Sequence, residues 1–453
     1  MTLTPLFSRG LLAALLLTCG ALAPAQAAGG SGGGGGGGSG GGAIIATSSG
    51  TADVDLPGEI LVKLRRSESL GPLLASYPVT LLSRFGARPI YRLKVIGSAR
   101  VKDVLARLVL DPEVMIAETN PSQRSPEARK NVPWAIGTAS AYMAQWAPQA
   151  LNLAEAQRLA SGEGVRVAVL DTGVDASHPL LAGRLLAGHD FVDGDSDPAE
   201  GGSAANGAWG HGTHVAGLVA MVAPLAKIMP LRVLDADGVG NAWVLAEALL
   251  YALDPDGNPA TDDGAHVINL SLGSLVRTRL MDSIALLAAC APAVPDDAIA
   301  DRSDPGYRDD EHRCANSNGA VVVAAAGNDA SKSEKQYPAA EGAYGLLSVG
   351  ASNADRALAG FSNFGPWIDL AAPGEGITSA VPGGYGTWSG TSMAAPLAAG
   401  TAALLRSMDL RIAPSDVVKR LKRTTAVLCG TALRQVDAGA AVNNRIPPSS
   451  NCR

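Results

Sequence analysis

From Trp146 onward, short apolar runs alternate with stretches of helical spacing, and this alternation constrains the fold more than any other feature of the sequence. The predicted strands are the apolar runs at Val165–Leu170, Lys227–Val233, His266–Leu270, Ala320–Ala325 and Leu346–Val349. The predicted helices are His211–Met221, Trp243–Ala252, Arg279–Ala289 and Ser392–Met408. Continuous apolar strands separated by helices indicate a parallel sheet buried on both faces. We therefore predict an α/β fold, in which a functional site lies just beyond the carboxyl ends of the strands.

The composition agrees with this fold class. The chain has 453 residues with 47% hydrophobic content, which is enough for one large domain and a smaller unit. Aromatic residues are only 4%, against 54 glycines, so a small-residue interior is favoured over a coiled coil or a β-sandwich. The net charge is −6 and no basic stripe is present, which gives no electrostatic basis for binding nucleic acid.

Residues 1–27 have the features of an export signal. Arg9 precedes the apolar run at residues 11–17, and residues 25–27 offer a small-x-small cleavage site. The run is shorter than the roughly 20 residues that a membrane span needs. A lipidated Cys19 is the less favoured alternative. Because no later stretch is long and apolar enough for a stable span, we expect a secreted or periplasmic protein.

Export changes the interpretation of the cysteines. Without Cys19, four remain, and they allow three disulfide connectivities: Cys290, Cys314, Cys429 and Cys452. The sequential pairing of Cys290 with Cys314 and of Cys429 with Cys452 closes two local loops, each stabilising by roughly 3–4 kcal/mol on loop entropy. Metal binding is less favoured, because no C-x-x-C pair is present.

Two further regions precede the large domain. Residues 28–53 are a glycine-rich linker that cannot form a core. Residues 54–122 have the order β-α-β-β-α-β, which predicts a small ferredoxin-like α+β unit. Its expected strands are Gly58–Leu64, Val79–Phe85, Ile90–Val95 and Val114–Glu118, with helices near Ser69–Ser76 and Val101–Leu110. Residues 123–145 are predicted as a polar, proline-containing linker to the domain at 146–453.

The first polar motif is Asp-Thr-Gly, where a buried strand ends in Asp171 and Gly173 permits a turn out of the sheet. The same three residues are the signature of aspartic proteases. Such enzymes need two facing carboxylates, and the sequence has a single copy, so that alternative would require a dimer.

The second motif is Gly-His-Gly-Thr-His, which places His211 at a helix start and His214 one turn later. Zinc binding by the two histidines would need a third ligand, and no accompanying Glu-x-x-His or cysteine pair is present. By itself, the motif would also fit an ordinary histidine at the helix end.

Asn328 and Ser392 complete the set. Asn328 follows a predicted buried strand and presents a carboxamide at the sheet edge, although a turn asparagine would have the same sequence. Ser392 follows Gly390 in the first turn of a helix, where free N–H groups favour negative charge. Such a serine is either a helix cap or a nucleophile beside ready-made donors. Together these motifs place Asp, His, Asn and Ser at one edge of the sheet.

With its motifs in the order Asp, His, Ser, the chain resembles the subtilisin-like serine proteases, the subtilases, over residues 146–440. The resemblance implies a three-layer subtilisin-like fold. It also implies that Ser392 is the nucleophile, His211 the general base and then acid, and Asp171 the residue that orients His211. The Asn328 side chain and the Ser392 N–H would form the oxyanion hole.

The same resemblance covers the first unit. The segments Glu59–Leu64 and Asp111–Glu118 make residues 54–122 similar to the inhibitory propeptide of the family. We therefore expect a proenzyme that cuts itself within the 123–145 linker, acts on polypeptides and is a monomer.

The resemblance also implies where substrate binds. A polypeptide would lie as an added strand between the segments Gly238-Val239-Gly240 and Ser271-Leu272-Gly273, whose backbone groups are free to pair. The segment Ala325-Ala326-Gly327 would form the wall of the primary specificity pocket.

Calcium is where the sequence departs from the secreted members of the family. The loop between Ala220 and Pro224 is shorter, and Leu180 stands where those members place an aspartate. The tight calcium site of the family is therefore predicted to be absent, and no cofactor is expected. A weak site at Asp193, Asp195 and Asp197 is the less favoured alternative to a solvated acidic loop, because the EF-hand positions are not filled.

A protein of another class would share this pattern: a subtilase-like surface or binding protein that is catalytically silent. Such proteins usually lack one catalytic residue, and the sequence retains Asp171, His211 and Ser392. The sequence therefore favours the enzyme.

Overall fold

The structure, a computed structural model, describes residues 53–290 and 319–448, apart from residues 87, 131, 133 and 259. In these residues the central sheet has nine strands in the order β16-β17-β13-β12-β11-β10-β6-β8-β7. Neighbouring strands are parallel, except for the antiparallel pair β16 and β17. The strands are β6 Arg166–Asp171, β7 His189–Asp190, β8 Lys227–Arg232, β10 Val267–Leu270, β11 Val321–Ala325, β12 Leu346–Ser352, β13 Leu370–Pro373, β16 Ala426–Val427 and β17 Arg434–Gln435. The mostly parallel sheet predicted from the sequence is confirmed.

Helices cover both faces of this sheet, which gives three layers. The long helices are α7 His211–Val222, α8 Ala242–Leu253, α9 Arg279–Cys290 and α11 Thr391–Met408. Alternate residues of β6 point to opposite faces, because side chains alternate along a strand. Val167 and Val169 belong to the apolar cluster that includes residues of α7 and α11. Ala168 and Leu170 belong to the cluster that includes residues of α8 and α9.

Small residues allow α7 and α11 to pack closely. Residues 391–405 of α11 are all buried, and a Cβ atom added at Gly400 would collide with Val222 of α7. A helix enclosed in this way fixes the position of its first turn, and therefore of Ser392.

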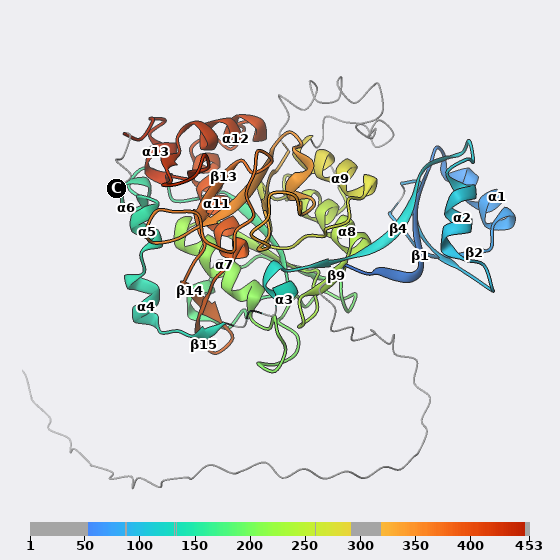
Figure 1. Cartoon of the computed structure of the whole chain (residues 1–453), viewed down its shortest axis with the longest axis horizontal. Coiled ribbons are helices and arrows are strands. Elements are labelled where there is room, and N and C mark those ends of the chain that lie inside the picture. Colours follow the sequence, from blue (N-terminus) through green and yellow to red (C-terminus); the bar gives the residue numbers. More distant parts are fainter. Residues whose placement is uncertain are drawn as a thin grey trace, which may run out of the picture. The chain divides into compact units, whose positions relative to one another are not determined.

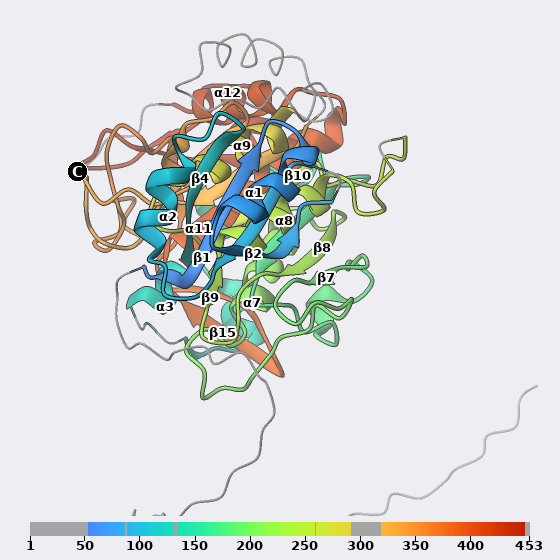
Figure 2. The same cartoon turned by 90° about the vertical axis from the view of Figure 1, so that its right-hand side faces the viewer.

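The N-terminal part forms a second sheet with the order β2-β3-β1-β4, continued by β9. Its strands are β1 Asp55–Leu64, β2 Val79–Arg84, β3 Ile90–Val95 and β4 Val114–Arg124, and its helices are α1 Leu70–Ser76 and α2 Val101–Leu108. Both helices lie on the same face of the sheet (Figure 2). The predicted order β-α-β-β-α-β is therefore present. On the other face, Phe85 packs edge-on against Trp243 of α8, with ring centroids 5.1 Å apart.

Strand β4 is longer than the sequence indicated. The predicted strand ended at Glu118, whereas β4 continues to Arg124 because residues 122–124 pair with β9, Val239–Asn241, in antiparallel register (Figure 1). The predicted linker also contains regular elements: α3 Pro126–Lys130, β5 Ala135–Ile136 and α4 Ala139–Ala144. Their partners are distant in the sequence, so local patterns gave no sign of them.

The remaining elements are mostly short. They are η1 Ser67–Ser69, α5 Ala147–Ala150, α6 Leu153–Ala156, η2 Pro179–Leu181, η3 Ala339–Glu341, β14 Ile377–Val381, β15 Gly384–Trp388, α12 Pro414–Arg423 and α13 Ala438–Val442. Strands β14 and β15 form a hairpin whose edge pairs with β5. In the described part of the chain, no helix has the length and apolar character needed to cross a membrane.

Some predictions fall on residues that the structure does not describe. These are the export signal at 1–27, almost all of the 28–53 linker, Cys314 and Cys452. Cys290 and Cys429 are each disulfide-bonded. The pairing proposed for the four cysteines stays a prediction.

Candidate active site

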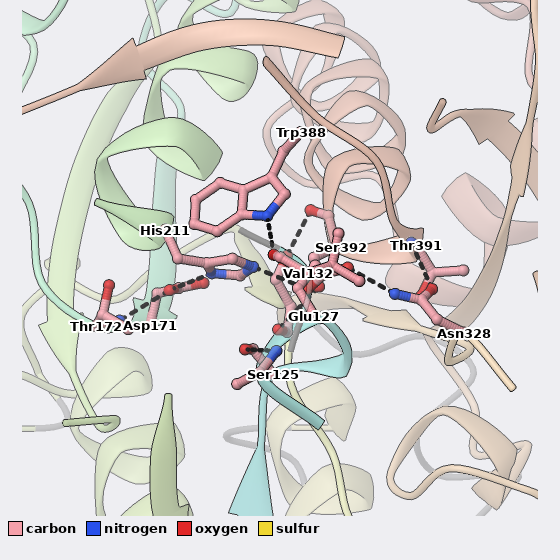
Figure 3. Close-up of polar contacts among 12 residues, drawn as sticks. Ser125, Glu127, Val132, Asp171, Thr172, His211, Asn328, Trp388, Thr391 and Ser392 are labelled. Carbon is pink, nitrogen blue, oxygen red and sulfur yellow. Dashed lines mark hydrogen bonds and ion pairs between the residues drawn. The ribbon is translucent and has the colours of Figure 1, made fainter. Parts of the chain in front are cut away.

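The three predicted catalytic residues come from three different elements and lie together (Figure 3). Asp171 is the last residue of β6, His211 the first of α7, and Ser392 the second of α11. All three are buried. The Nδ1 atom of His211 lies 2.6 Å from Oδ1 of Asp171, which also accepts a 2.8 Å hydrogen bond from the backbone N–H of Thr172. This fixes the imidazole ring and leaves its Nε2 atom for a second partner.

That second partner is Glu127 of α3. Its Oε2 atom lies 3.0 Å from Nε2 of His211, and the glutamate is fully buried. The Ser392 hydroxyl instead donates to the carbonyl oxygen of Ser271 at 3.2 Å. Glu127 therefore occupies the position on Nε2 that a serine hydroxyl holds in a working Ser-His-Asp triad.

Two carboxylates around one imidazole stabilise its protonated form. Burial lowers the pKa of His211, but the charge and hydrogen bond of Asp171, with the hydrogen bond and charge of Glu127, outweigh it and raise the pKa from 6.5 to about 10. In this conformation His211 is an imidazolium, which cannot accept a proton from Ser392. The Trp388 ring packs edge-on against the imidazole, with ring centroids 5.2 Å apart, and helps to enclose it.

Asn328 is held with its amide group directed at the same carboxylate. Its Oδ1 atom accepts hydrogen bonds from both the backbone N–H and the hydroxyl of Thr391, each at 2.9 Å. The Nδ2 atom must therefore face the other way, where it donates to Oε1 of Glu127 at 2.8 Å. The carboxamide is thus a pre-aimed donor beside the first turn of α11, and it binds an anionic oxygen here.

The predicted substrate-binding segments are paired with the chain itself. Gln123 lies opposite Gly240, and the Ser125 N–H donates to the Gly238 carbonyl at 3.1 Å. On the other side, Arg124 and Gly273 exchange two backbone hydrogen bonds of 2.9 Å. Residues 123–125 therefore form a middle strand between the two segments.

Pro126 ends this strand. If the antiparallel register with Gly273 continued, residue 126 would lie opposite Ser271. Proline has no N–H to donate there, and it is favoured in the first turn of a helix. The chain turns into α3 at this point, and the side chain of Glu127, not a peptide carbonyl, enters the site.

Helix α3 is held in place by charged contacts of two residues that follow Glu127. Arg129 forms a 2.7 Å ion pair with Asp53 in which both side chains are almost fully buried, and it donates to the Gly273 carbonyl at 3.1 Å. Lys130 pairs with Asp329 at 2.7 Å. The position of Glu127 is therefore part of a wider set of contacts.

The predicted specificity-pocket residues lie beside the site. Ala325 ends β11, and Ala326 and Gly327 follow it in buried positions. Gly327 has a φ of +99° and its N–H donates to the Thr391 hydroxyl at 3.0 Å. The structure thus brings this segment next to the start of α11, and its contribution to specificity stays a prediction.

His214 has a separate environment from His211. Its Nε2 atom lies 3.1 Å and 3.2 Å from the carbonyl oxygens of Ile377 and Gly386, in the hairpin of β14 and β15. Burial lowers the pKa of His214 to about 3, so the ring is neutral and donates from Nε2. The two histidines therefore bind different protein oxygens, which disfavours the zinc alternative.

Acidic residues gather in two exposed loops. In the loop considered for calcium, Asp193 forms a 2.5 Å ion pair with Arg232, and Oδ1 of Asp195 accepts a 2.8 Å hydrogen bond from the N–H of Asp197. A second group has oxygen atoms within 4.8 Å of one another: Asp254, Asp256 and Asp263. An aspartate cluster is thus present, although not where the sequence suggested.

Comparison with known proteins agrees with the fold. Residues 162–446 match the model of the subtilase family. The chain is 34% identical over 352 residues to the thermophilic serine proteinase of Bacillus sp. strain AK1, which covers 75% of this chain and 74% of the relative. It is 31% identical over 459 residues to an extracellular protease of Xanthomonas campestris pv. campestris, over 88% of this chain and 72% of that protein. A solved protease structure from Pseudoalteromonas arctica matches at 30% identity with a TM-score of 0.53, over 67% of this chain and 97% of that one.

The chain therefore belongs to the subtilase family. It is a subtilisin-like serine endopeptidase, and its fold is the α/β fold of that family.

Sequence reasoning missed some residues of the site. Glu127 lies in a stretch that the sequence predicts as polar linker, and Trp388 directly precedes the serine motif without a predicted role. Glu200, which bonds the residues around Asp171 and His211, lies in a glycine-rich loop. One signal in the sequence could have pointed to Glu127. Pro126 ends the extended segment 123–125, and the residue after such a proline is placed to enter the site with its side chain.

Proposed function

We propose that Asp171, His211 and Ser392 form the catalytic triad of this endopeptidase. Ser392 attacks the peptide carbonyl while His211 takes its proton, and His211 later protonates the leaving amine. Asp171 keeps the ring oriented and stabilises its charged form. The side-chain amide of Asn328 and the backbone N–H of Ser392 bind the oxyanion. The chemistry needs no cofactor.

One observation carries this proposal. Asn328 has its amide fixed by Thr391 and donates to Oε1 of Glu127, whose Oε2 atom contacts His211, so the amide donor and the base bind the same carboxylate beside the first turn of α11, which carries Ser392. The test is labelling by a fluorophosphonate probe and hydrolysis of a protein substrate. We expect wild-type protein to react and Ser392→Ala to do neither. A wild-type protein that folds and matures but hydrolyses nothing would favour the silent binding protein instead.

We further propose that the chain is made as a self-processing proenzyme, with residues 54–122 as its inhibitory propeptide. The support is that residues 123–125 pair with the two segments predicted to bind substrate and that Glu127, together with Asp171, raises the pKa of His211. The cleavage would fall within residues 123–145. Ser392→Ala should therefore accumulate as the unprocessed chain, and the appearance of the same mature fragment from purified Ser392→Ala would contradict self-cleavage.

Polypeptide substrates would replace residues 123–125 between the Gly238–Gly240 and Ser271–Gly273 segments. The small residues Ala325–Gly327 would then line the pocket for the side chain before the cleaved bond, and would favour an apolar side chain of medium or large size. Profiling the cleavage of a peptide library by the mature enzyme tests this preference.

We propose that the enzyme works outside the cytoplasm, as a monomer. The support is the signal-like segment at 1–27 and the similarity to a protein named as an extracellular protease. Disulfides between Cys290 and Cys314 and between Cys429 and Cys452 fit this location. A weak calcium site at Asp193, Asp195 and Asp197 has less support, since Arg232 already balances Asp193. Fractionation of the producing cells and non-reducing peptide mapping test the location and the pairing.

A further inference from the structure

Glu200 is a carboxylate behind the active site that the catalytic scheme does not use. It lies in the loop between β7 and α7, and its carboxylate is turned toward Thr172 and Thr213, which are fully buried. Its Oε2 atom accepts hydrogen bonds from the Thr172 hydroxyl at 3.0 Å and from the Gly210 N–H at 3.2 Å. Its Oε1 atom accepts from both the N–H and the hydroxyl of Thr213 at 2.9 Å.

These contacts join the two elements that carry Asp171 and His211. Thr172 follows Asp171, and its hydroxyl also accepts a 2.9 Å hydrogen bond from the Gly212 N–H, next to His211. Thr213 accepts a 2.8 Å hydrogen bond from the N–H of Asp175, on the Asp171 side. Glu200 therefore forms hydrogen bonds with both the turn after Asp171 and the first turn of α7. Each of the two threonines adds a further hydrogen bond between these two elements.

Close backbone packing gives these bonds little room to relax. A Cβ atom added at Gly173 would collide with Ala199, the residue before Glu200. A Cβ atom added at Gly212 would collide with the Gly173 carbonyl. Two glycines therefore allow close backbone packing: Gly173 between the Asp171 turn and the Glu200 loop, and Gly212 between the start of α7 and the Asp171 turn.

The four donors also specify the chemical form of the side chain. A carboxylate has acceptor sites for all of them, and its charge lies at the N-terminus of a 12-residue helix, where a negative charge is favourable. Burial raises the pKa of Glu200 to about 7, against the lowering effect of the Thr213 and Thr172 hydrogen bonds. Glutamine cannot replace it, because each carboxylate oxygen accepts a hydrogen bond from a backbone N–H, that of Gly210 or that of Thr213. The NH₂ group of glutamine would face one of these two donors.

We propose that Glu200 is a positioning residue for catalysis, which sets the distance and orientation between Asp171 and His211 by holding the Thr172 turn against the first turn of α7. The proposal rests on the triad assigned above. A residue that only stabilised the helix end would alter thermal stability and leave turnover per active site unchanged. A positioning residue alters turnover, because catalytic groups displaced by about 1 Å can lose about 10²-fold in rate.

The test compares Glu200→Gln with wild type and with Glu163→Gln, a matched change at an exposed glutamate. Each variant is matured by a trace of tagged wild-type enzyme that is then removed, and active sites are counted by titration. For Glu200→Gln we expect kcat per active site to fall at least tenfold, and up to about 10²-fold, with KM changed less than about twofold. The low-field proton resonance of the hydrogen bond between His211 and Asp171 should shift or broaden. Unchanged kcat and an unchanged resonance would overturn the proposal.

A second variant keeps the test decisive if Glu200→Gln folds poorly. Thr172→Val keeps the shape of the side chain and removes the hydroxyl that links Glu200 to the Gly212 N–H. We expect it to lower kcat in the same way, and the double variant to lose less than the product of the two single losses. Full activity of Thr172→Val, or independent losses, would contradict the proposal. The proposed function is tested separately, because it requires only that the wild type is active and that Ser392→Ala is not. It would therefore stand even if the Glu200 variants contradicted the positioning role.

Discussion

The contact between Glu127 and His211 gives the sharpest prediction, through the substitution Glu127→Gln. Glutamine keeps the size of the side chain and can still accept the hydrogen bond from Asn328. It removes one of the two negative charges that raise the pKa of His211, and leaves that of Asp171. The blocked conformation should therefore open more often, and His211 should recover its capacity as a base whenever it does.

The size of the effect follows from the contacts that change. In the structure the carboxylate makes one hydrogen bond to charged His211 at 3.0 Å and one to Asn328 at 2.8 Å. Hydrogen bonds to a charged group contribute about 1.5–3 kcal/mol each, and neutral ones about 0.5–1.5 kcal/mol. Glutamine loses the bond to charged His211, about 1.5–3 kcal/mol, and keeps a weaker, neutral bond to Asn328, so the closed state should lose about 3 kcal/mol. With about 1.4 kcal/mol for each tenfold change, the open fraction should rise about 10²-fold.

The assay is the initial rate at which a fluorophosphonate probe labels Ser392 in the unprocessed band on a gel. Glu68→Gln is the matched control, because Glu68 is an exposed glutamate of the same N-terminal unit. Ser392→Ala gives the background. We expect Glu127→Gln to label about 10²-fold faster than wild type and Glu68→Gln to label at the wild-type rate. Labelling of Glu127→Gln within about twofold of wild type would refute the idea that this carboxylate blocks the site.

Three further predictions concern pH, the oxyanion donor and packing. Asp171 and, to a smaller extent, Glu127 raise the pKa of His211 to about 10, and only Glu127 leaves when the site opens, so the stabilisation that Glu127 gives to the closed state is present at neutral pH and is lost as the pH rises through about 10. The labelling rate of unprocessed wild type, divided by that of the mature enzyme, should therefore rise across this range, whereas a flat ratio would argue against the linkage. Asn328→Ala should lower kcat of the mature enzyme about 10²–10³-fold with KM little changed, and a loss below about threefold would exclude it as the oxyanion donor. In the Ser392→Ala background, Gly400→Ala should reduce the free energy of unfolding in urea by about 1–3 kcal/mol through overlap with Val222, while Gly360→Ala, where an added Cβ atom meets open space, should change it little.

The sequence predicted the central sheet well because its evidence is local. A strand buried on both faces must be mostly apolar, and β6, β8, β10, β11 and β12 all have this property, with polar residues mainly at the strand ends. The same holds for the catalytic motifs, since each residue follows a strand or begins a helix. Where the evidence is local, a pattern of neighbouring residues is enough.

The parts that sequence could not predict depend on distant partners. Residues 122–124 look polar, and they become a strand only because β9 pairs with them. In the sequence, nothing distinguishes Glu127 from other linker residues, and only the fold brings His211 and Asn328 around it. Glu200 is similar, because Thr172 and Thr213 come from separate motifs. In these cases the function of a side chain is set by tertiary contacts that no short window of sequence contains.

In the proposed scheme, inhibition and catalysis use the same donor, the side-chain amide of Asn328, and this couples their strengths. Up to Ser125 the chain binds as a substrate would, through backbone pairing. After Pro126 it binds as an anion, because Glu127 offers a negative oxygen to Asn328 where a reacting peptide would develop one. The Glu127 carboxylate is already negatively charged, whereas a peptide carbonyl becomes so only in the transition state. Because the carboxylate contains no peptide bond for Ser392 to attack, Glu127 is bound at this position without being cleaved there. It follows that Asn328→Ala should weaken the blockade as well as turnover: its unprocessed form should open more readily than wild type, even though its mature form hydrolyses substrate more slowly. A variant that lost turnover but kept its unprocessed form as tightly closed as wild type would show that the two anions are bound by different groups.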